Sequence, residues 1–190
     1  MSLARICAAL TLFMAAGSAM AHPGHGAGFA AGFAHPYGGF DHLLAMVAVG
    51  LFAARQNGML RWALPTGFVA AMLAGALLGA QGFSMPQLES GVAASVLILG
   101  LLVAFMVRLP VTAAVALVVV MALFHGQAHQ AEMPAGSLFD FAAGFAIATA
   151  SLHLFGFMLA RWMPGSVAAQ GIKRALGAGI AAAGLFFMAA

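Results

Sequence analysis

The chain has 190 residues, of which 64% are hydrophobic and only 6% are charged. About a quarter of the residues in a soluble globular domain are charged. This composition therefore excludes an ordinary soluble domain and predicts an all-α polytopic membrane protein with the lipid bilayer as its surroundings. The seven Lys and Arg residues are scattered along the chain and form no basic run longer than Lys173-Arg174, which argues against a nucleic-acid partner.

The first 21 residues have the pattern of a secretory signal peptide. Arg5 provides a positive start, Ile6 to Ala16 is a short apolar run, and Ala19-Met20-Ala21 has the small-x-small form of a cleavage site. An uncleaved signal anchor is the alternative, but the apolar run is short and the cleavage site is well formed. We therefore expect residues 1–21 to be removed.

The mature chain is then expected to begin with a lead rich in glycine and histidine that contains His22 and His25. Two imidazoles at this spacing, together with the free α-amine, suit a weak metal-capturing tail. A disordered stub is the equally weighted alternative. Cys7, the only cysteine, leaves with the signal peptide, so the mature protein offers imidazole and carboxylate ligands but no thiolate.

Six apolar segments predict a single six-span transmembrane domain over residues 22–190. The first segment is too short to cross a bilayer alone, so either its helix starts near Ala27 and breaks at Pro36-Tyr37-Gly38-Gly39, or the segment lies below the headgroups. The predicted spans are Asp41–Ala54, Trp62–Gln81, Gly91–Val107, Pro110–Phe124, Leu138–Ala160 and Ala175–Met188.

Charge orients these spans in the membrane. If the mature N-terminus is periplasmic, every Lys and Arg of the mature chain falls on the cytoplasmic side, as the positive-inside rule requires. All four acidic residues and six of the seven histidines then fall in outer loops or at outer helix ends. We therefore expect the outer face to carry the chemistry. The inner cations are Arg55, Arg61, Arg108, Arg161, Lys173 and Arg174.

The first polar group of the chain lies where span one begins. His35, Asp41 and His42 fall within eight residues of a chain that is otherwise almost wholly apolar. Ionisable groups inside a membrane are costly, which favours a functional role for them. Asp41 also suits the N-cap of the first helix. Among the methionines, which are usually packing residues, only Met46 is placed to act as a soft metal ligand, one turn after His42.

The second polar group closes span four. His125 and His129 lie four residues apart, and Glu132 follows three residues later, so the three side chains share one face if the helix continues. A histidine pair at this spacing is a recurring arrangement for divalent metals. Gly126 weakens the prediction that the helix continues. Taken singly, each histidine is better explained as an interfacial residue. Taken together, the two groups predict a recessed outer metal site formed by His35, Asp41, His42, His125 and His129.

His153 differs from the other histidines because it lies deep inside span five, about 20 Å along the helix from Asp140. Thr149 lies one turn earlier on the same face, whereas Asp140 lies on a different face. A histidine at this depth predicts a transport path, to which we also assign Thr149 and Asp140. The alternative is a hydrogen bond between helices.

Three motifs of the chain resemble a known family. His35 to Met46 reads HPYGGFDHLLAM and resembles HPxxGxDHxLAM, the first-span signature of the HupE/UreJ family of bacterial nickel permeases. Phe124 to His129 resembles the family's FHGxAH motif, and Leu152-His153 with Gly156 resembles its LHxxG element. The resemblance covers essentially the whole chain, and one departure is Gln130, which stands where a glycine is expected.

The resemblance implies uptake of Ni²⁺, or in some members Co²⁺, across the inner membrane to supply hydrogenase or urease. It implies a permease and not an enzyme, with the transition-metal ion as substrate, no prosthetic group, and a metallochaperone or a metalloenzyme maturation system as partner. Ligand chemistry alone gives a broader answer, because imidazole and carboxylate also suit Zn²⁺ and Cu²⁺.

Two other functions remain as alternatives. A membrane-embedded zinc-dependent lipid amide hydrolase would also use histidines and an aspartate near one membrane face, with zinc activating a water molecule. A bis-histidine haem protein needs two histidines that face each other at matching depth, and His153 has no such partner in the sequence. The chain contains no nucleotide-binding loop, so we expect no use of ATP by this chain itself.

Overall fold

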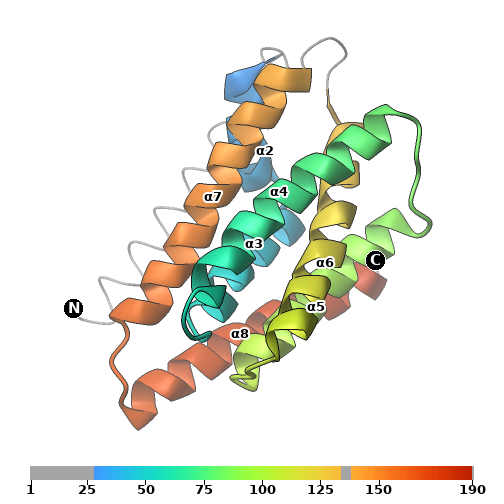
Figure 1. The fold of residues 1–190 in the computed structure, drawn as a ribbon. Coiled ribbons are helices and arrows are strands. Elements are labelled where there is room, and N and C mark those ends of the chain that lie inside the picture. The colour runs from blue at the N-terminus through green and yellow to red at the C-terminus, as the bar shows by residue number, and fades with distance from the viewer. Residues whose placement is uncertain (1–27, 134–137, 190) are drawn as a thin grey trace.

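The chain folds into a bundle of α-helices (Figure 1). The computed structural model describes residues 28–133 and 138–189, and within these ranges it contains seven helices and no strand. The all-helical prediction is therefore correct for these ranges. The predicted signal peptide and the lead with His22 and His25 lie outside the described residues. The helices are α2 (Phe29–Gly38), α3 (Phe40–Ala53), α4 (Leu60–Ala80), α5 (Leu88–Ala104), α6 (Val111–Ala131), α7 (Leu138–Trp162) and α8 (Val167–Ala189).

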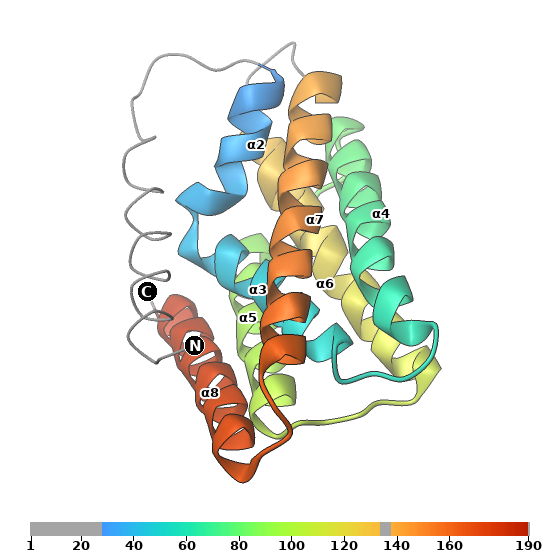
Figure 2. The ribbon, with the colours of Figure 1, turned by 90° about the vertical axis from the view of Figure 1, so that its left-hand side faces the viewer.

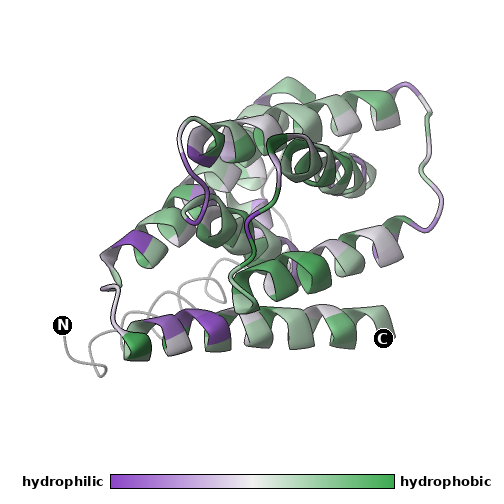
Figure 3. Ribbon diagram, turned by 60° about the horizontal axis from the view of Figure 1, so that its bottom comes forward, coloured by the Kyte–Doolittle hydropathy of each residue, from purple (hydrophilic) through white to green (hydrophobic). Residues whose placement is uncertain are grey.

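The lengths and compositions of the helices are those of a membrane protein. Among the described residues, α4, α6, α7 and α8 are each long and apolar enough to cross a bilayer. The pair α2 and α3 meets the same test together but is bent by 87°, and α5 is apolar but shorter. Hydrophobic residues cover the helices, and hydrophilic residues gather in the connections and near helix ends (Figure 3).

The first predicted span is a broken helix, as the first of the two sequence alternatives requires. The chain enters α2 at Phe29, passes Pro36 inside that helix, and breaks at Gly39, whose φ of −102° and ψ of 117° are extended. Gly39 is the N-cap of α3 and makes no side-chain cap hydrogen bond. The expectation that Asp41 is the N-cap is therefore wrong, because the helix begins before it and Asp41 lies in the first turn.

Three other predicted helix boundaries differ from those of the structure. Helix α6 continues beyond Phe124 to Ala131, because Gly126 packs against the backbone of α4, and this packing outweighs its low helix propensity. Helix α8 begins at Val167 rather than at Ala175. Its first turns carry Lys173 and Arg174, so an apolar run marks only its second half. Helix α5 is shifted by one turn toward the N-terminus relative to the predicted Gly91–Val107.

Glycines bring the helices into close contact in pairs. A Cβ atom at Gly156 of α7 would overlap the Val47 carbonyl of α3, and a Cβ at Gly50 of α3 would overlap the His153 carbonyl of α7. Small residues allow such close approach of backbones, which is how helices associate in membranes. Helix α7 lies along both α2 and α3, and α4 lies beside α6 (Figure 2). The same reciprocal contact joins Gly32 with Gly144 (α2 and α7), Gly75 with Gly126 (α4 and α6) and Gly100 with Gly177 (α5 and α8).

A substitution at one of these contacts tests the packing. We expect Gly156→Ala to lower the thermal midpoint of the purified protein by roughly 2–10 °C, because the added methyl group forces α7 away from α3. Gly67→Ala in α4 is the matched control, since a Cβ there meets nothing within 4 Å. Equal midpoints for the two variants in detergent would show that the close approach does not contribute to stability.

Candidate metal centre

Three buried histidines converge at one end of the bundle. His42 comes from the first turn of α3, and His125 and His129 come from the last two turns of α6. Each offers one ring nitrogen, and these nitrogens lie within 4.8 Å of one another. The centroid of the His42 ring lies 4.0 Å from that of His129 and 5.0 Å from that of His125. Two motifs that lie far apart in the sequence therefore form one cluster.

Two local features of the chain place these side chains. Helix α6 runs unbroken through Gly126, so His125 and His129 lie one turn apart on the same face. The bend at Gly39 starts α3 at this point of the bundle, and His42 meets both of them. A Cβ at Gly39 would lie 2.9 Å from Asp41 Oδ1 and 3.2 Å from His42 Nδ1, so a side chain at this position would shift both groups.

Asp41 fixes the ring of His42. Its Oδ1 atom accepts a hydrogen bond from His42 Nδ1 at 2.7 Å and another from the His42 backbone N–H at 2.8 Å. In the neutral imidazole the proton is then on Nδ1, and the lone pair is on Nε2. His42 Nε2 is buried and has no hydrogen-bond partner among the described residues. A carboxylate that orients a histidine in this way is typical of metal-binding histidines.

Ser95 of α5 does the same for His125. The Ser95 hydroxyl donates its single proton to the Val92 carbonyl at 2.7 Å, so its oxygen accepts from His125 Nε2, also at 2.7 Å. The lone pair of His125 is therefore on Nδ1, which is buried without a partner in the described chain. Sequence reasoning missed Ser95. The available signal was a lone hydroxyl within the apolar run of α5.

The unpaired ring nitrogens are suited to bind a ligand. Both ring nitrogens of His129 are also buried without a described partner. Each buried polar atom that is left unpaired costs about 1–3 kcal/mol, so native proteins rarely gather several of them at one point. The lone pairs of three neutral imidazoles, two of them oriented from outside the cluster, suit a divalent transition-metal ion.

A second group of candidate ligands extends the cluster toward the surface. His35 Nε2 donates to Glu132 Oε2 at 2.8 Å, and the His35 ring lies 4.8 Å from the His129 ring. His35, His129 and Glu132 also have ligand atoms within 4.8 Å of one another. The hydrogen bond from His35 holds the pKa of Glu132 below its ordinary value, so the side chain is a carboxylate near neutral pH. His129 belongs to both groups and joins an accessible site to a buried one.

Aromatic rings enclose the cluster. The Phe145 ring lies 3.8 Å from the ring of His129, and Phe141 lies 5.4 Å from His35. The fully buried Phe68 contacts His125 at 5.7 Å and His153 at 5.1 Å between ring centroids. These rings exclude water and strengthen the electrostatic interactions of the site. Nothing in the sequence distinguishes them from the other phenylalanines of the chain.

The remaining predicted residues lie elsewhere. His153 Nδ1 donates to the Met46 carbonyl at 2.8 Å, which is a hydrogen bond between helices of the kind that the sequence left as the alternative to a transport path. Its Nε2 is buried without a described partner. The Met46 side chain is buried in the core. Thr149 donates to the sulfur of Met72. Asp140 lies in the exposed first turn of α7 and belongs to neither ligand group of the described residues.

Comparison with known proteins identifies the family. Residues 10–187 match the model of the family described as HupE / UreJ protein. The chain belongs to the HupE/UreJ family. It is 44% identical over 168 residues to Protein HupE of Rhizobium leguminosarum bv. viciae, an alignment that covers 87% of each chain. No solved structure matches the chain. The family resemblance of the three motifs is therefore confirmed, and it fits a transporter rather than an enzyme.

The role of the hydrogen bond between Ser95 and His125 can be tested by measuring metal affinity. If the cluster holds a divalent ion, Ser95→Ala should weaken the affinity of the purified protein for Ni²⁺ by about 10–100-fold, because His125 loses the acceptor that fixes its tautomer. Ser90→Ala on the same helix is the control, since that serine is exposed. Isothermal titration gives both affinities. Equal affinities in the two variants would show that Ser95 does not contribute to metal binding.

Proposed function

We propose that this protein is an inner-membrane permease that takes up Ni²⁺, or Co²⁺, through a histidine and aspartate site on the periplasmic side. The main support is the convergence of the buried ring nitrogens of His42, His125 and His129, which have no described partner. Family membership adds the substrate class, because the HupE/UreJ family is linked to uptake of nickel or cobalt.

The proposed topology has six spans after a cleaved signal peptide, with the bent pair α2 and α3 as the first span and α5 as the third. The positions of the cationic side chains support this topology. Five of the six Lys and Arg residues predicted to be cytoplasmic line one cavity, so the three connections that carry them meet at one end of the bundle. The histidine cluster lies at the other end of α3, about 20 Å from Arg55.

The arrangement of ligands suggests the order of steps. The ion is first bound by His35, His129 and Glu132 near the surface, and then passes to His42, Asp41 and His125, with His129 shared between the two positions. His22 and His25 collect the ion before this step. Inward transfer uses His153, whose Nε2 has no described partner and whose ring contacts Phe68 as the ring of His125 does, together with Thr149. Met46 is a further candidate ligand one turn after His42, and Asp140, in the exposed first turn of α7, is a path residue on the outer side. A metallochaperone or a metalloenzyme maturation system receives the ion.

The hydrolase alternative finds no support in the comparisons, which match a transporter family over most of the chain. We therefore keep transport as the function. The choice among Ni²⁺, Co²⁺ and Zn²⁺ rests on the family rather than on the ligands, because imidazole and carboxylate bind all three.

Uptake of radioactive nickel by cells that express the chain tests the proposal. We expect His42→Ala and His125→Ala each to reduce uptake at least tenfold, because each removes one of three converging nitrogens. Excess Co²⁺ should compete, whereas excess Mg²⁺, which prefers oxygen ligands, should not. Ser90→Ala is the control, with membrane insertion of each variant measured. Uptake by the wild type that equals uptake by empty-vector cells would contradict transport.

The proposed ligands also predict a pH dependence. Histidines bind metal only when neutral, so protons compete with the ion for the ring nitrogens as the pH falls. We therefore expect Ni²⁺ affinity to be full near pH 7.5 and to fall steeply below about pH 6. Binding to the purified protein separates this effect from any change in membrane energetics. An affinity that does not change between pH 5 and 8 would argue against histidine ligation.

A further inference from the structure

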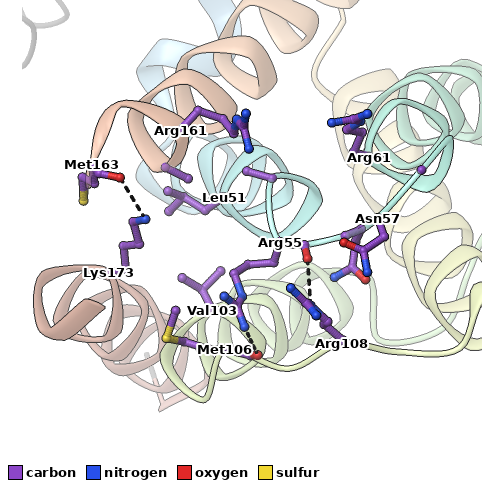
Figure 4. A pocket seen from close by; sticks show the side chains of 14 residues that line it. Leu51, Arg55, Asn57, Arg61, Val103, Met106, Arg108, Arg161, Met163 and Lys173 are labelled. Atoms are coloured by element: carbon purple, nitrogen blue, oxygen red, sulfur yellow. Dashed lines mark hydrogen bonds between the residues drawn. The ribbon is translucent and has the colours of Figure 1, made fainter. Parts of the chain in front are cut away.

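A basic cavity of about 490 Å³ lies among the helix ends shown in Figure 4. It is at the end of α3 opposite to His42. It is formed where α3 ends, α4 begins, α5 turns into α6, and α7 ends beside α8. Five cationic side chains line the cavity, and each of these five places contributes one of them. The cations are Arg55, Arg61, Arg108, Arg161 and Lys173.

No described carboxylate neutralises these cations. Arg55 donates to the Met106 carbonyl at 3.0 Å, Arg108 donates to the Arg55 carbonyl at 3.2 Å, and Lys173 donates to the Met163 carbonyl at 3.3 Å. The Nε atoms of Arg55 and Arg61 are buried without a hydrogen-bond partner among the described residues. The acidic residues lie in first turns or a C-cap at the far ends of α3, α5, α6 and α7.

The convergence of these cations exceeds what membrane orientation requires. The positive-inside rule depends on the number of cations in the loops, not on the direction in which their side chains point. Here Arg61 and Arg161 point toward each other across the cavity, with Arg55 and Arg108 between the surrounding helix ends (Figure 4). Burial and the nearby Arg108 lower the pKa of Arg55, as expected for like charges held together without a counterion.

We propose that this cavity binds a phosphate group. Guanidinium groups pair with phosphate through two parallel hydrogen bonds, and several of them around a compact volume suit a tetrahedral dianion or a phosphodiester. Basic pockets between helix ends at the inner membrane surface are also where anionic lipid headgroups bind. The phosphate therefore comes from an anionic lipid of the inner leaflet or from free inorganic phosphate. The inference rests on the cavity and, for the lipid source, on the proposed topology, and it does not depend on metal transport.

Native mass spectrometry of the purified full chain tests this site. We expect the wild type to retain phosphatidylglycerol at least tenfold more than phosphatidylcholine, whose choline offsets the phosphate charge, or to be stabilised by millimolar inorganic phosphate. Retention of the lipid despite excess inorganic phosphate assigns the headgroup, and displacement of the lipid by inorganic phosphate assigns a site open to both. Stabilisation by inorganic phosphate without lipid retention assigns the free ion.

Substitutions distinguish the cavity from general surface charge. The double variant Arg61→Gln and Arg161→Gln removes two cations that point into the cavity, and we expect it to reduce binding at least tenfold. Arg174→Gln removes one cation from the same end of the molecule but outside the lining, so binding should change less than twofold. If the double variant does not fold, Arg161→Lys keeps the charge but loses the paired hydrogen bonds, and it should weaken binding at least threefold.

Three results would overturn the proposal. The first is retention of phosphatidylglycerol no greater than that of phosphatidylcholine together with no effect of inorganic phosphate. The second is an equal loss of binding in the cavity variants and in Arg174→Gln, which would indicate surface charge alone. The third is stabilisation by an acidic peptide such as polyglutamate but by neither phosphate source, which would indicate a protein partner for the cavity.

Discussion

The hydrogen bond between Asp41 and His42 is the interaction on which the candidate metal centre depends. It lies directly after the break at Gly39, and the backbone there passes so close to both side chains that a larger residue would displace them. The bond puts the proton of His42 on Nδ1 and leaves Nε2 free inside the cluster. Ser95 acts on His125 in the same way. Hydrogen bonds from α3 and α5 therefore determine which ring nitrogens of His42 and His125 carry lone pairs.

Close helix packing at glycines also positions the histidines. Gly126 lies between the two histidine turns of α6 and brings that helix against α4, so the residue that weakens the helix locally is required by the contact. Gly50 and Gly156 bring α7 against α3, and this contact lets His153 reach the Met46 carbonyl. The candidate ligands, the buried His153 and the basic cavity thus follow one another along α3 and the helices that pack on it.

The sequence predicts the residues of the site better than their surroundings. The predicted spans and their orientation by charge place His35, Asp41, His42, His125 and His129 at the same membrane face, and the structure brings these residues together. Their role as ligands stays a prediction. The break in the first span is one of the two alternatives that the sequence allows, because fourteen residues cannot cross a bilayer. The sequence did not predict the roles of Ser95 and Phe68 or the end of α6 at Ala131, since each depends on a contact with another helix. The gathering of Arg61 and Arg161 around one cavity likewise follows from tertiary structure and not from their spacing.

The most direct test of the account is the X-ray absorption spectrum of nickel bound to the purified protein. The structure predicts a first shell that contains imidazole nitrogens, with the multiple-scattering pattern of at least three histidines in the wild type. Loss of one imidazole in His125→Ala, with Ser90→Ala unchanged, would agree with the cluster of His42, His125 and His129. A shell of oxygen ligands alone, or a spectrum that His125→Ala leaves unchanged, would contradict it.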